Sequence, residues 1–303
     1  MKKRSLKYLE NLPSVKDKKI IVTGANTGIG YAACDLLLGK GAHIVLACRN
    51  KERGEAALAK LQAAHPKSKV ELMHFDQSSL SLIEEAVKEI KEKHNDFYAL
   101  ILNAGIMCPG EDKWYCPGVP LTSGTNFIAP LYILTLLKDF LNNVKDDKRI
   151  IIHGSAASWF EKYKSKEKDI LSNNTTQLHQ YNLSKLGTTQ VFMHFQKENT
   201  NPKVKFLLAE PGAVSSDIFR TVKAWYKKVV LVTIKALHFT VPEGALPLVT
   251  LATKDVNDGD YYKPRDFFYL RGLPIKKKLK ERRRNPKMIE DGYEVIEMIK
   301  AIK

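Results

Sequence analysis

The stretch "IIVTGANTGIG", Ile20 to Gly30, decides the fold, because an apolar run opens abruptly into three glycines. The glycines are Gly24, Gly28 and Gly30, which gives the spacing G-x-x-x-G-x-G. A glycine-rich turn between a strand and a helix can hold the pyrophosphate of a dinucleotide, since backbone N–H groups then meet the phosphates without side chains in the way. A plain tight turn would use the same glycines, so the surrounding sequence has to decide.

The surrounding sequence alternates short apolar runs with longer helical patterns. Strands are predicted at residues 19–23, 43–47, 69–75, 98–102, 149–153 and 204–209, and helices around 28–40, 51–64, 78–94, 124–143 and 180–199. Continuously apolar strands are typical of a parallel sheet that is covered on both faces. The pattern predicts an α/β fold: one doubly wound Rossmann domain with a central parallel sheet of about seven strands, helices on both faces and a ligand crevice at the carboxyl ends of the strands.

The net charge of +16 is concentrated near the two ends of the chain, with a net +5 in residues 1–19 and a net +8 in residues 271–287. We therefore expect a basic N-terminal extension (1–16), a dinucleotide-binding and catalytic domain (17–263) and a basic C-terminal extension (264–303). The extensions would be solvated tails, or would be attracted weakly to an anionic membrane surface. Nucleic acid is not an expected partner, because the charge is not spread over a face of the fold.

The four cysteines, Cys34, Cys48, Cys108 and Cys116, form no C-x-x-C pair, and the first two fall in predicted core elements. Buried reduced thiols are therefore expected rather than disulfides, and no metal site is expected. The basic N-terminus lacks the apolar stretch of a signal peptide, and no run of about 18 apolar residues is present that could span a bilayer. We expect a cytoplasmic protein, either free or peripheral on a cytosolic membrane face, and not a secreted one.

Motifs beyond the glycine turn indicate a family. "GANTGIG" followed by "LACRNKERGEAAL" (46–58) resembles the short-chain dehydrogenase/reductases, and most of all the branch of retinol dehydrogenases and WW-domain oxidoreductase. The resemblance continues through "NAGIM" (103–107), "GSAAS" (154–158), "YNLSK" (181–185), "EPGAVSSDI" (210–218) and "TVPEGA" (240–245), so it covers about residues 17–253. It implies an enzyme that transfers hydride between a nicotinamide and a carbonyl or alcohol carbon.

The resemblance implies four catalytic residues, Asn126, Ser155, Tyr181 and Lys185. Tyr181 and Lys185 are four residues apart on a predicted helix, so both side chains project from one face. A nearby ammonium lowers the pKa of a tyrosine from about 10, which would let Tyr181 exchange a proton with the substrate oxygen near neutral pH. Ser155 would donate a hydrogen bond to that oxygen. Asn126 would complete a water-linked proton relay to Lys185, although an asparagine that caps or kinks a helix would fit the sequence too.

A basic residue after the second predicted strand indicates the cofactor. A NAD site usually has a carboxylate at this point, and Arg49 stands there instead, which favours the 2′-phosphate of NADP(H) over NAD(H). The alternative for Arg49 is an ordinary surface arginine. Asp76, which follows the third predicted strand, resembles a residue that contacts the adenine, but it could equally be a helix N-cap. The resemblance implies a cofactor site made of Gly24, Asn26, Thr27, Gly28, Ile29, Gly30, Arg49, Asn50, Asp76, Gln77, Asn103, Ala104, Gly105, Tyr181, Lys185, Pro211, Gly212, Val214 and Ser216.

Residues 216–240 occupy the position of a substrate lid in the family. Within them "VVLVTIKAL" (229–237) is unusually apolar, which indicates a lipophilic substrate, a lid that touches a membrane, or simply a helix packed on the sheet. We therefore expect an NADPH-dependent reductase of a lipophilic ketone or aldehyde, or the reverse oxidation of a secondary alcohol. A non-catalytic nucleotide sensor or scaffold protein is the alternative. The resemblance also allows a homodimer that pairs through the helix at 180–199.

Overall fold

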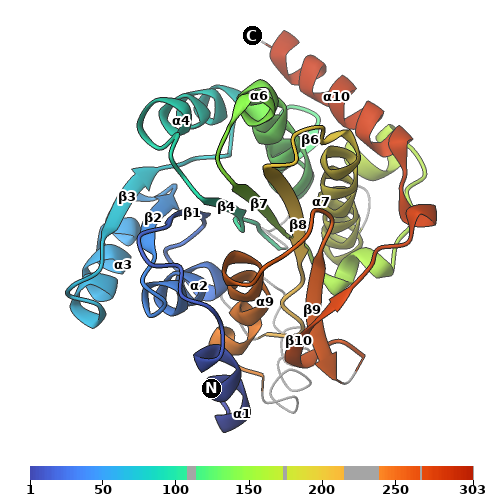
Figure 1. Ribbon diagram of the computed structural model, residues 1–303. Coiled ribbons are helices and arrows are strands. Elements are labelled where there is room, and N and C mark those ends of the chain that lie inside the picture. The colour runs from blue at the N-terminus through green and yellow to red at the C-terminus, as the bar shows by residue number, and fades with distance from the viewer. Residues whose placement is uncertain (108–113, 173–175, 215–238, 267, 303) are drawn as a thin grey trace.

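Eight strands form the central sheet of the computed structural model, which describes residues 1–107, 114–172, 176–214, 239–266 and 268–302 (Figure 1). Their order is β10-β9-β8-β7-β4-β1-β2-β3. The bounds are β1 (Lys19–Thr23), β2 (His43–Cys48), β3 (Val70–His74), β4 (Ala99–Leu102), β7 (Lys148–His153), β8 (Val204–Ala209), β9 (Tyr261–Asp266) and β10 (Arg271–Lys277). Seven strands are parallel and β10 alone is antiparallel to its neighbour, so the predicted doubly wound fold is confirmed. A short hairpin, β5 (Trp114–Cys116) and β6 (Val119–Pro120), lies apart from this sheet.

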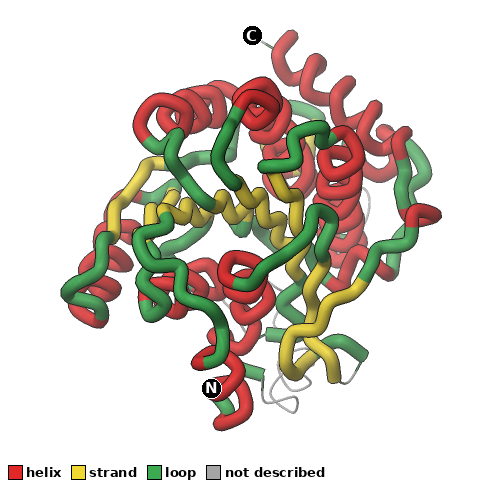
Figure 2. The backbone as a smooth tube through the Cα atoms, in the orientation of Figure 1, coloured by secondary structure: helices red, strands yellow, loops and turns green. Residues whose placement is uncertain are grey.

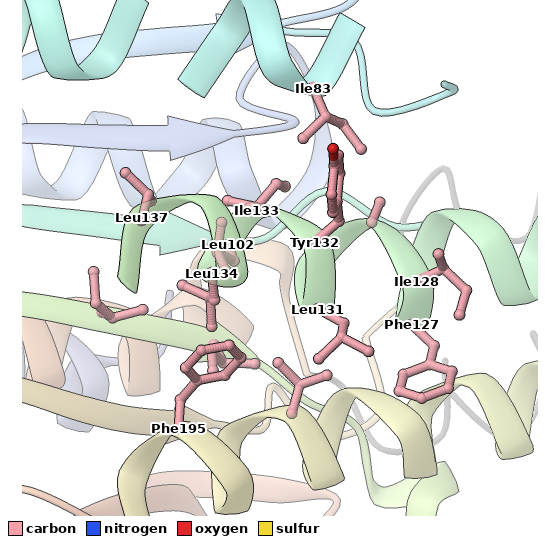
Figure 3. Close-up of a cluster of buried hydrophobic side chains, with 14 of the residues drawn as sticks. Ile83, Leu102, Phe127, Ile128, Leu131, Tyr132, Ile133, Leu134, Leu137 and Phe195 are labelled. Carbon is pink, nitrogen blue, oxygen red and sulfur yellow. The ribbon is translucent and has the colours of Figure 1, made fainter. Parts of the chain in front are cut away.

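Helices cover both faces of the sheet (Figure 2). One face carries α4 (Leu80–Lys93), α6 (Ala129–Asn143), α7 (Gln177–Glu198) and α10 (Pro286–Ala301), and the other carries α1 (Lys3–Glu10), α2 (Gly28–Leu38), α3 (Lys51–Ala64) and α9 (Val241–Thr253). Alternate strand residues supply the two cores, because successive side chains of a strand point to opposite faces. Ile21 belongs to the core under α4 and α6, whereas Ile20 and Val22 belong to the core under α2 and α9. Figure 3 shows part of the first core, with Ile83 of α4 and Leu134 of α6.

The sheet has its topological switch at β1, which pairs with β4 on one side and with β2 on the other. In such sheets the connections leave in opposite directions at this point, and a crevice opens outside the carboxyl ends of the strands. The glycine turn follows β1, and Asn103 follows β4, so both lie at the mouth of that crevice.

The helix predicted at 124–143 starts earlier, at Leu121, and has three parts. A short α5 (Leu121–Ser123) leads into a π-helical turn, η1 (Gly124–Ile128), and then into α6. Gly124 is required there, because a Cβ on it would lie 2.1 Å from Cγ of Tyr115. Single π-helical turns occur frequently at functional sites, and Asn126 lies in the middle of this one.

The expected division into a catalytic domain and a C-terminal extension differs from the structure. The expected boundary at 263/264 falls inside β9, β10 continues the central sheet, and α10 packs on α7. Val295 of α10 is fully buried, and a Cβ on Gly292 would lie 2.7 Å from Cδ2 of Leu131. Apolar residues between the basic ones supply this packing, which net charge alone does not reveal. The described residues 264–266 and 268–302 are therefore part of the domain rather than a solvated tail.

The N-terminal extension also docks on the domain. In α1 the Ser5 hydroxyl donates a hydrogen bond to Oε1 of Glu243 at 2.8 Å, and the backbone N–H of Lys2 donates to the same oxygen at 2.9 Å. The hydroxyls of Tyr8 and Thr250 are 3.1 Å apart. Three contacts thus attach α1 to α9, so residues 1–10 are held against the domain.

Helix α10 and the residues just before it pack on α7, the helix through which the resemblance allows a homodimer to pair. Gln190 of α7 donates to the backbone oxygen of Arg283 at 3.1 Å and accepts from the Asn285 N–H at 2.6 Å. One turn further on, the His194 ring meets the Tyr293 hydroxyl at 3.2 Å. A partner subunit could not reach this face of α7 without displacing α10.

Two remaining expectations concern cysteines and membrane spans. Cys34 and Cys48 are buried free thiols, as predicted, and burial raises the pKa of Cys48 to about 11, whereas Cys108 lies outside the described residues. Most of the expected lid, residues 216–238, also lies outside them. In the part of the chain that the structure describes, no helix combines the length and the apolar character that a bilayer crossing requires.

Candidate active site

The glycine turn has the backbone that its sequence predicts. Gly24 and Gly28 have φ angles of +64° and +59°, in the left-handed region that favours glycine. Gly30 is needed for close packing, since a Cβ on it would lie 2.5 Å from both Nδ2 of Asn103 and the Gly24 carbonyl oxygen. Helix α2 starts at Gly28, so the N–H groups of its first turn lie at the crevice and fit an anionic phosphate. The other residues predicted for this turn, Asn26, Thr27 and Ile29, lie in it or in the first turn of α2.

Hydrogen bonds join the ends of β1 and β4. The Thr23 hydroxyl oxygen accepts from the backbone N–H groups of Asn103 and Ala104, both at 2.9 Å. In return, Nδ2 of Asn103 donates to the Thr23 carbonyl oxygen at 2.8 Å. These bonds hold the predicted residues Asn103 and Ala104 against the base of the glycine turn.

His153, the last residue of β7, extends this network and was not predicted as a site residue. Its Nδ1 is 2.7 Å from Oδ1 of Asn103, and an amide oxygen only accepts, so His153 carries its proton on Nδ1. Burial, and then the nearby charge of Lys185, lower its pKa to about 3, so the ring is neutral at physiological pH. A polar residue at the end of the apolar run "RIIIH" was the available signal.

Lys185 reaches the same point from α7. Its Nζ donates to the His153 carbonyl oxygen at 3.3 Å, and burial lowers its pKa to about 8. A Cβ on Gly105 would lie 3.4 Å from Nζ of Lys185 and 3.1 Å from Oδ1 of Asn126. The absence of a side chain at Gly105 therefore lets the lysine and the asparagine approach each other.

The Asn126 side chain is fixed by three hydrogen bonds. Its amide group exchanges bonds with the backbone of Ile106, accepting from N–H at 2.9 Å and donating to the oxygen at 2.8 Å. Its Nδ2 also donates to Oγ of Ser184 at 2.9 Å, and Ser184 donates to the Tyr181 carbonyl oxygen at 2.8 Å. Ser184, which the sequence reasoning missed, thus connects Asn126 to the turn of α7 that carries Tyr181. A proton relay through Asn126 stays a prediction.

Ser155 and Tyr181 come from neighbouring elements. Ser155 caps the short helix η2 (Ala156–Trp159), and its Oγ accepts from the Ala157 N–H at 3.2 Å. A hydroxyl that accepts in this way can still donate, so Ser155 keeps the donor that its predicted role needs. Half-buried Tyr181 lies one turn before Lys185 on α7, against which η2 packs.

The residues predicted around the adenosine have mixed roles in the structure. Exposed Arg49 follows β2, and Asn50 caps α3 by accepting from the Arg53 N–H at 2.8 Å. The Asp76 carboxylate accepts from the Ser78 N–H at 2.9 Å, but the N-cap of α4 is Ser79, so the alternative that Asp76 is the cap is wrong. The neighbouring Gln77 donates to the Thr125 carbonyl oxygen at 3.1 Å, which ties this loop to η1.

The Pro211-Gly212 segment leaves β8 next to the β9–β10 hairpin. Gly212 has a φ of +77°, and a Cβ on it would lie 2.5 Å from the Leu270 carbonyl oxygen. That oxygen accepts from the Ala213 N–H at 2.8 Å, and Val214 is buried. Ser216, predicted to complete the segment, lies outside the described residues.

Taken together, the described residues fit a dinucleotide. The left-handed glycines and the start of α2 offer N–H groups for a pyrophosphate, and Arg49 offers a cation within the next βα unit. A buried amine, Lys185, lies across the crevice from them. No three His, Cys, Asp or Glu side chains gather as metal ligands within the described ranges.

Comparisons with known proteins find likenesses of sequence and of fold. Residues 18–146 match a family model described as short chain dehydrogenase. The WW domain-containing oxidoreductase of Gallus gallus is 32% identical over 151 residues, which are 48% of this chain and 35% of that protein. The polyprenol dehydrogenase of Homo sapiens is 27% identical over 240 residues, which are 77% of this chain and 72% of that protein. The chain thus spans about a third of the first relative and nearly three quarters of the second.

A solved structure is alike over the whole fold. An uncharacterised protein of Mycobacterium paratuberculosis superposes with a TM-score of 0.72, covering 96% of both chains at 22% sequence identity. The likeness of fold therefore extends well beyond residue 146, where the match to the family model ends.

Proposed function

We propose that this chain is a short-chain dehydrogenase/reductase, an oxidoreductase that transfers hydride between NADP(H) and the carbonyl or alcohol carbon of a lipophilic substrate. The observation that carries the proposal is the hydrogen-bonded chain from the glycine turn to the catalytic helix. It runs from Thr23 through Asn103 and His153 to Lys185. One turn before Lys185, the same helix carries Tyr181.

Each residue has a defined part in reducing a carbonyl. The nicotinamide, when bound, supplies the hydride that forms the new C–H bond. Tyr181 gives its hydroxyl proton to the carbonyl oxygen, and Ser155 donates a hydrogen bond to that oxygen as its negative charge grows. Lys185, when protonated, stabilises the resulting phenolate, which regains a proton from solvent. Oxidation of an alcohol runs through the same steps in reverse.

The cofactor would be held at both ends of the crevice. The backbone of the glycine turn and the start of α2 would bind the pyrophosphate, and Arg49 would pair with the 2′-phosphate of NADP(H). Lys185 would bind the hydroxyls of the nicotinamide ribose, as the family resemblance implies. A lipophilic substrate is supported by the similarity to polyprenol dehydrogenase and by the apolar run at 229–237.

The decisive test is Tyr181→Phe, assayed by NADPH oxidation with a panel of aliphatic and aromatic ketones and aldehydes. A general acid contributes roughly 10²–10⁴-fold, so we expect kcat to fall about 1000-fold while NADPH affinity changes less than about threefold. A variant that turned over as fast as wild type would refute the mechanism. Wild-type protein that binds NADPH but reduces no member of the panel would favour the alternative, a nucleotide sensor or scaffold protein.

The cofactor preference is tested separately by thermal shift with NADPH and NADH. Arg49 predicts the larger stabilisation by NADPH, because its guanidinium can pair with the extra phosphate. Arg49→Asp should reverse the preference by placing a carboxylate near the ribose. Arg53→Asp is the matched control, since Arg53 is also exposed, on α3, and its replacement should leave the preference unchanged. A wild-type preference for NADH would remove the role of Arg49 and leave the proposed reaction intact.

A further inference from the structure

Four exposed aromatic side chains come from two loops beside the active site. Trp159 and Phe160 follow β7, whereas Phe268 and Tyr269 form the turn between β9 and β10 (Figure 1). Phe268 is 86% exposed and Phe160 is 78% exposed, more than any other large hydrophobic side chain among the described residues. A phenylalanine ring gains nothing from water, so a group of such exposed rings marks a surface that contacts something else.

One ammonium brings the two loops together. Nζ of Lys263 lies 3.6 Å from the ring centre of Tyr269 and 4.5 Å from that of Trp159. Trp159 and Tyr269 thus flank one buried lysine, and each is followed or preceded in the chain by one of the two most exposed phenylalanines, Phe160 and Phe268. We call Trp159, Phe160, Phe268 and Tyr269 the rim surface.

A strongly basic segment borders the rim surface. Arg283 stacks on Trp159, with its guanidinium carbon 3.8 Å from the ring centre, and donates to the Ser158 carbonyl oxygen at 2.8 Å. This contact attaches the run "KKKLKERRR" (276–284) to the rim surface. Lys277, Lys278, Lys280 and Arg282 of this run have no carboxylate within 4 Å in the described part of the chain.

The acidic groups nearby are already paired, so they do not cancel this charge. Asp266 is 2.7 Å from Nε of Arg265, and Glu281 is 3.6 Å from a guanidinium nitrogen of Arg284. The surface therefore combines exposed rings with unpaired cations, a composition typical of proteins that sit at an anionic membrane interface.

The rim surface adjoins the proposed substrate site. The short helix that Ser155 caps ends at Trp159, and Nε1 of Trp159 donates to Oε1 of Glu210 at 3.1 Å. Glu210 directly precedes the Pro211-Gly212 segment. Anything seated on the rim surface is therefore next to the place where the reacting carbonyl would lie.

We propose that the rim surface and the basic run seat this domain on an anionic lipid bilayer, so that a lipophilic substrate enters the active site from the membrane. The entry route rests on the proposed function, whereas the seating does not. Nucleic acid fits the surface less well, because bases stack on open aromatic faces, and cations already cover the faces of Trp159 and Tyr269.

The test is cosedimentation of the full chain with vesicles of phosphatidylcholine alone or with a quarter phosphatidylserine. Only the anionic vesicles should bind it. Replacing Phe160 and Phe268 by Ser, or Lys277, Lys278, Lys280 and Arg282 by Gln, should each weaken binding about tenfold or more. The matched control replaces Lys60, Lys67, Lys69 and Lys88 by Gln; these exposed lysines lie on α3, on α4 or just before β3, near the opposite edge of the sheet, and the control should bind as wild type does.

Every other outcome overturns the proposal. Absence of binding to anionic vesicles, or equal weakening by the control variant, would exclude a seat at the rim surface. Unchanged vesicle binding by the Phe160→Ser, Phe268→Ser variant together with tight binding of single-stranded RNA through the basic run would assign the run to nucleic acid. NADPH oxidation with a water-soluble ketone, measured on the same variants without vesicles, should stay within about twofold of wild type. This readout separates failure of the membrane seat from failure of the proposed enzyme function.

Discussion

The middle of the central sheet, at β1 and β4, and its edge, at β9 and β10, are held together in different ways. Around β1 and β4, backbone atoms and small side chains pack closely, as where Gly30 touches Asn103 and the Gly24 carbonyl. Around β9 and β10, long cationic and aromatic side chains make the contacts, as where Lys263 lies between Trp159 and Tyr269. The family model matches residues 18–146, which include β1 and β4 but neither β9 nor β10.

The two regions therefore serve different purposes: one would bind the cofactor and the other holds distant parts of the chain together. Binding a dinucleotide needs a backbone of one particular shape, which short local patterns encode. The hairpin and α10 instead use contacts between residues far apart in the chain, and such contacts can vary without altering the cofactor site. Substitutions around β1 and β4 should therefore change cofactor affinity. Substitutions in the terminal segments should change stability or surface binding and leave cofactor affinity unchanged.

The largest effect is expected from Gly30→Val, in the glycine turn that follows β1. Its Cβ would lie 2.5 Å from Nδ2 of Asn103 and from the Gly24 carbonyl oxygen, so the turn must open. Overpacking of this kind costs roughly 1–3 kcal/mol, and we expect NADPH affinity, measured by fluorescence titration, to fall about 100-fold. Gly39→Ala is the control, because its Cβ has no neighbour closer than 3.4 Å. Equal losses in both variants would show that close packing at Gly30 does not matter.

The second prediction concerns the buried amine of Lys185, which contacts the end of β7, between these two regions of the sheet. Burial lowers the pKa of Lys185 from 10.5 to about 8, so between those values the unfolded chain holds a proton that the folded chain has lost. Stability must then rise with pH across this window, and near pH 7 the folded protein bears a penalty of about 3 kcal/mol. Without cofactor, Lys185→Met should be more stable than wild type at pH 7, with the difference shrinking as the pH rises from 8 to 10.

Urea unfolding at pH 7 and pH 9.5 measures this difference. Lys88→Met is the matched control, since Lys88 is an exposed residue of α4 and its replacement should change little at either pH. If Lys185→Met were less stable than wild type by the same amount at both pH values, the lysine would stabilise the fold rather than destabilise it through the burial of its charge.

The glycine turn and the spacing of Tyr181 and Lys185 could be predicted from the sequence because their signals are local. An apolar strand, left-handed glycines and a helix start follow one another within eleven residues, and Tyr181 and Lys185 are one turn apart. His153 and Ser184 were missed, since their roles depend on Asn103 and Asn126, which lie 50 and 58 residues away. The net charge of the C-terminal segment predicts a solvated tail, because it hides the apolar residues that pack on the domain.

The smallest effect is expected in the N-terminal segment, where α1 docks on α9. Ser5→Ala removes a hydrogen bond to the buried carboxylate of Glu243, so the free energy of unfolding should fall by about 1–2 kcal/mol. Ser14→Ala is the control, because Ser14 donates to the Lys40 carbonyl and accepts from the Lys16 N–H at the exposed surface, where the loss of its hydroxyl should cost little. NADPH affinity should be the same in both variants, since neither contact touches the glycine turn. A loss of cofactor affinity in Ser5→Ala would mean that the terminal helix and the cofactor site are coupled through α9, which packs on α2, and the separation of the two purposes would fail at that point.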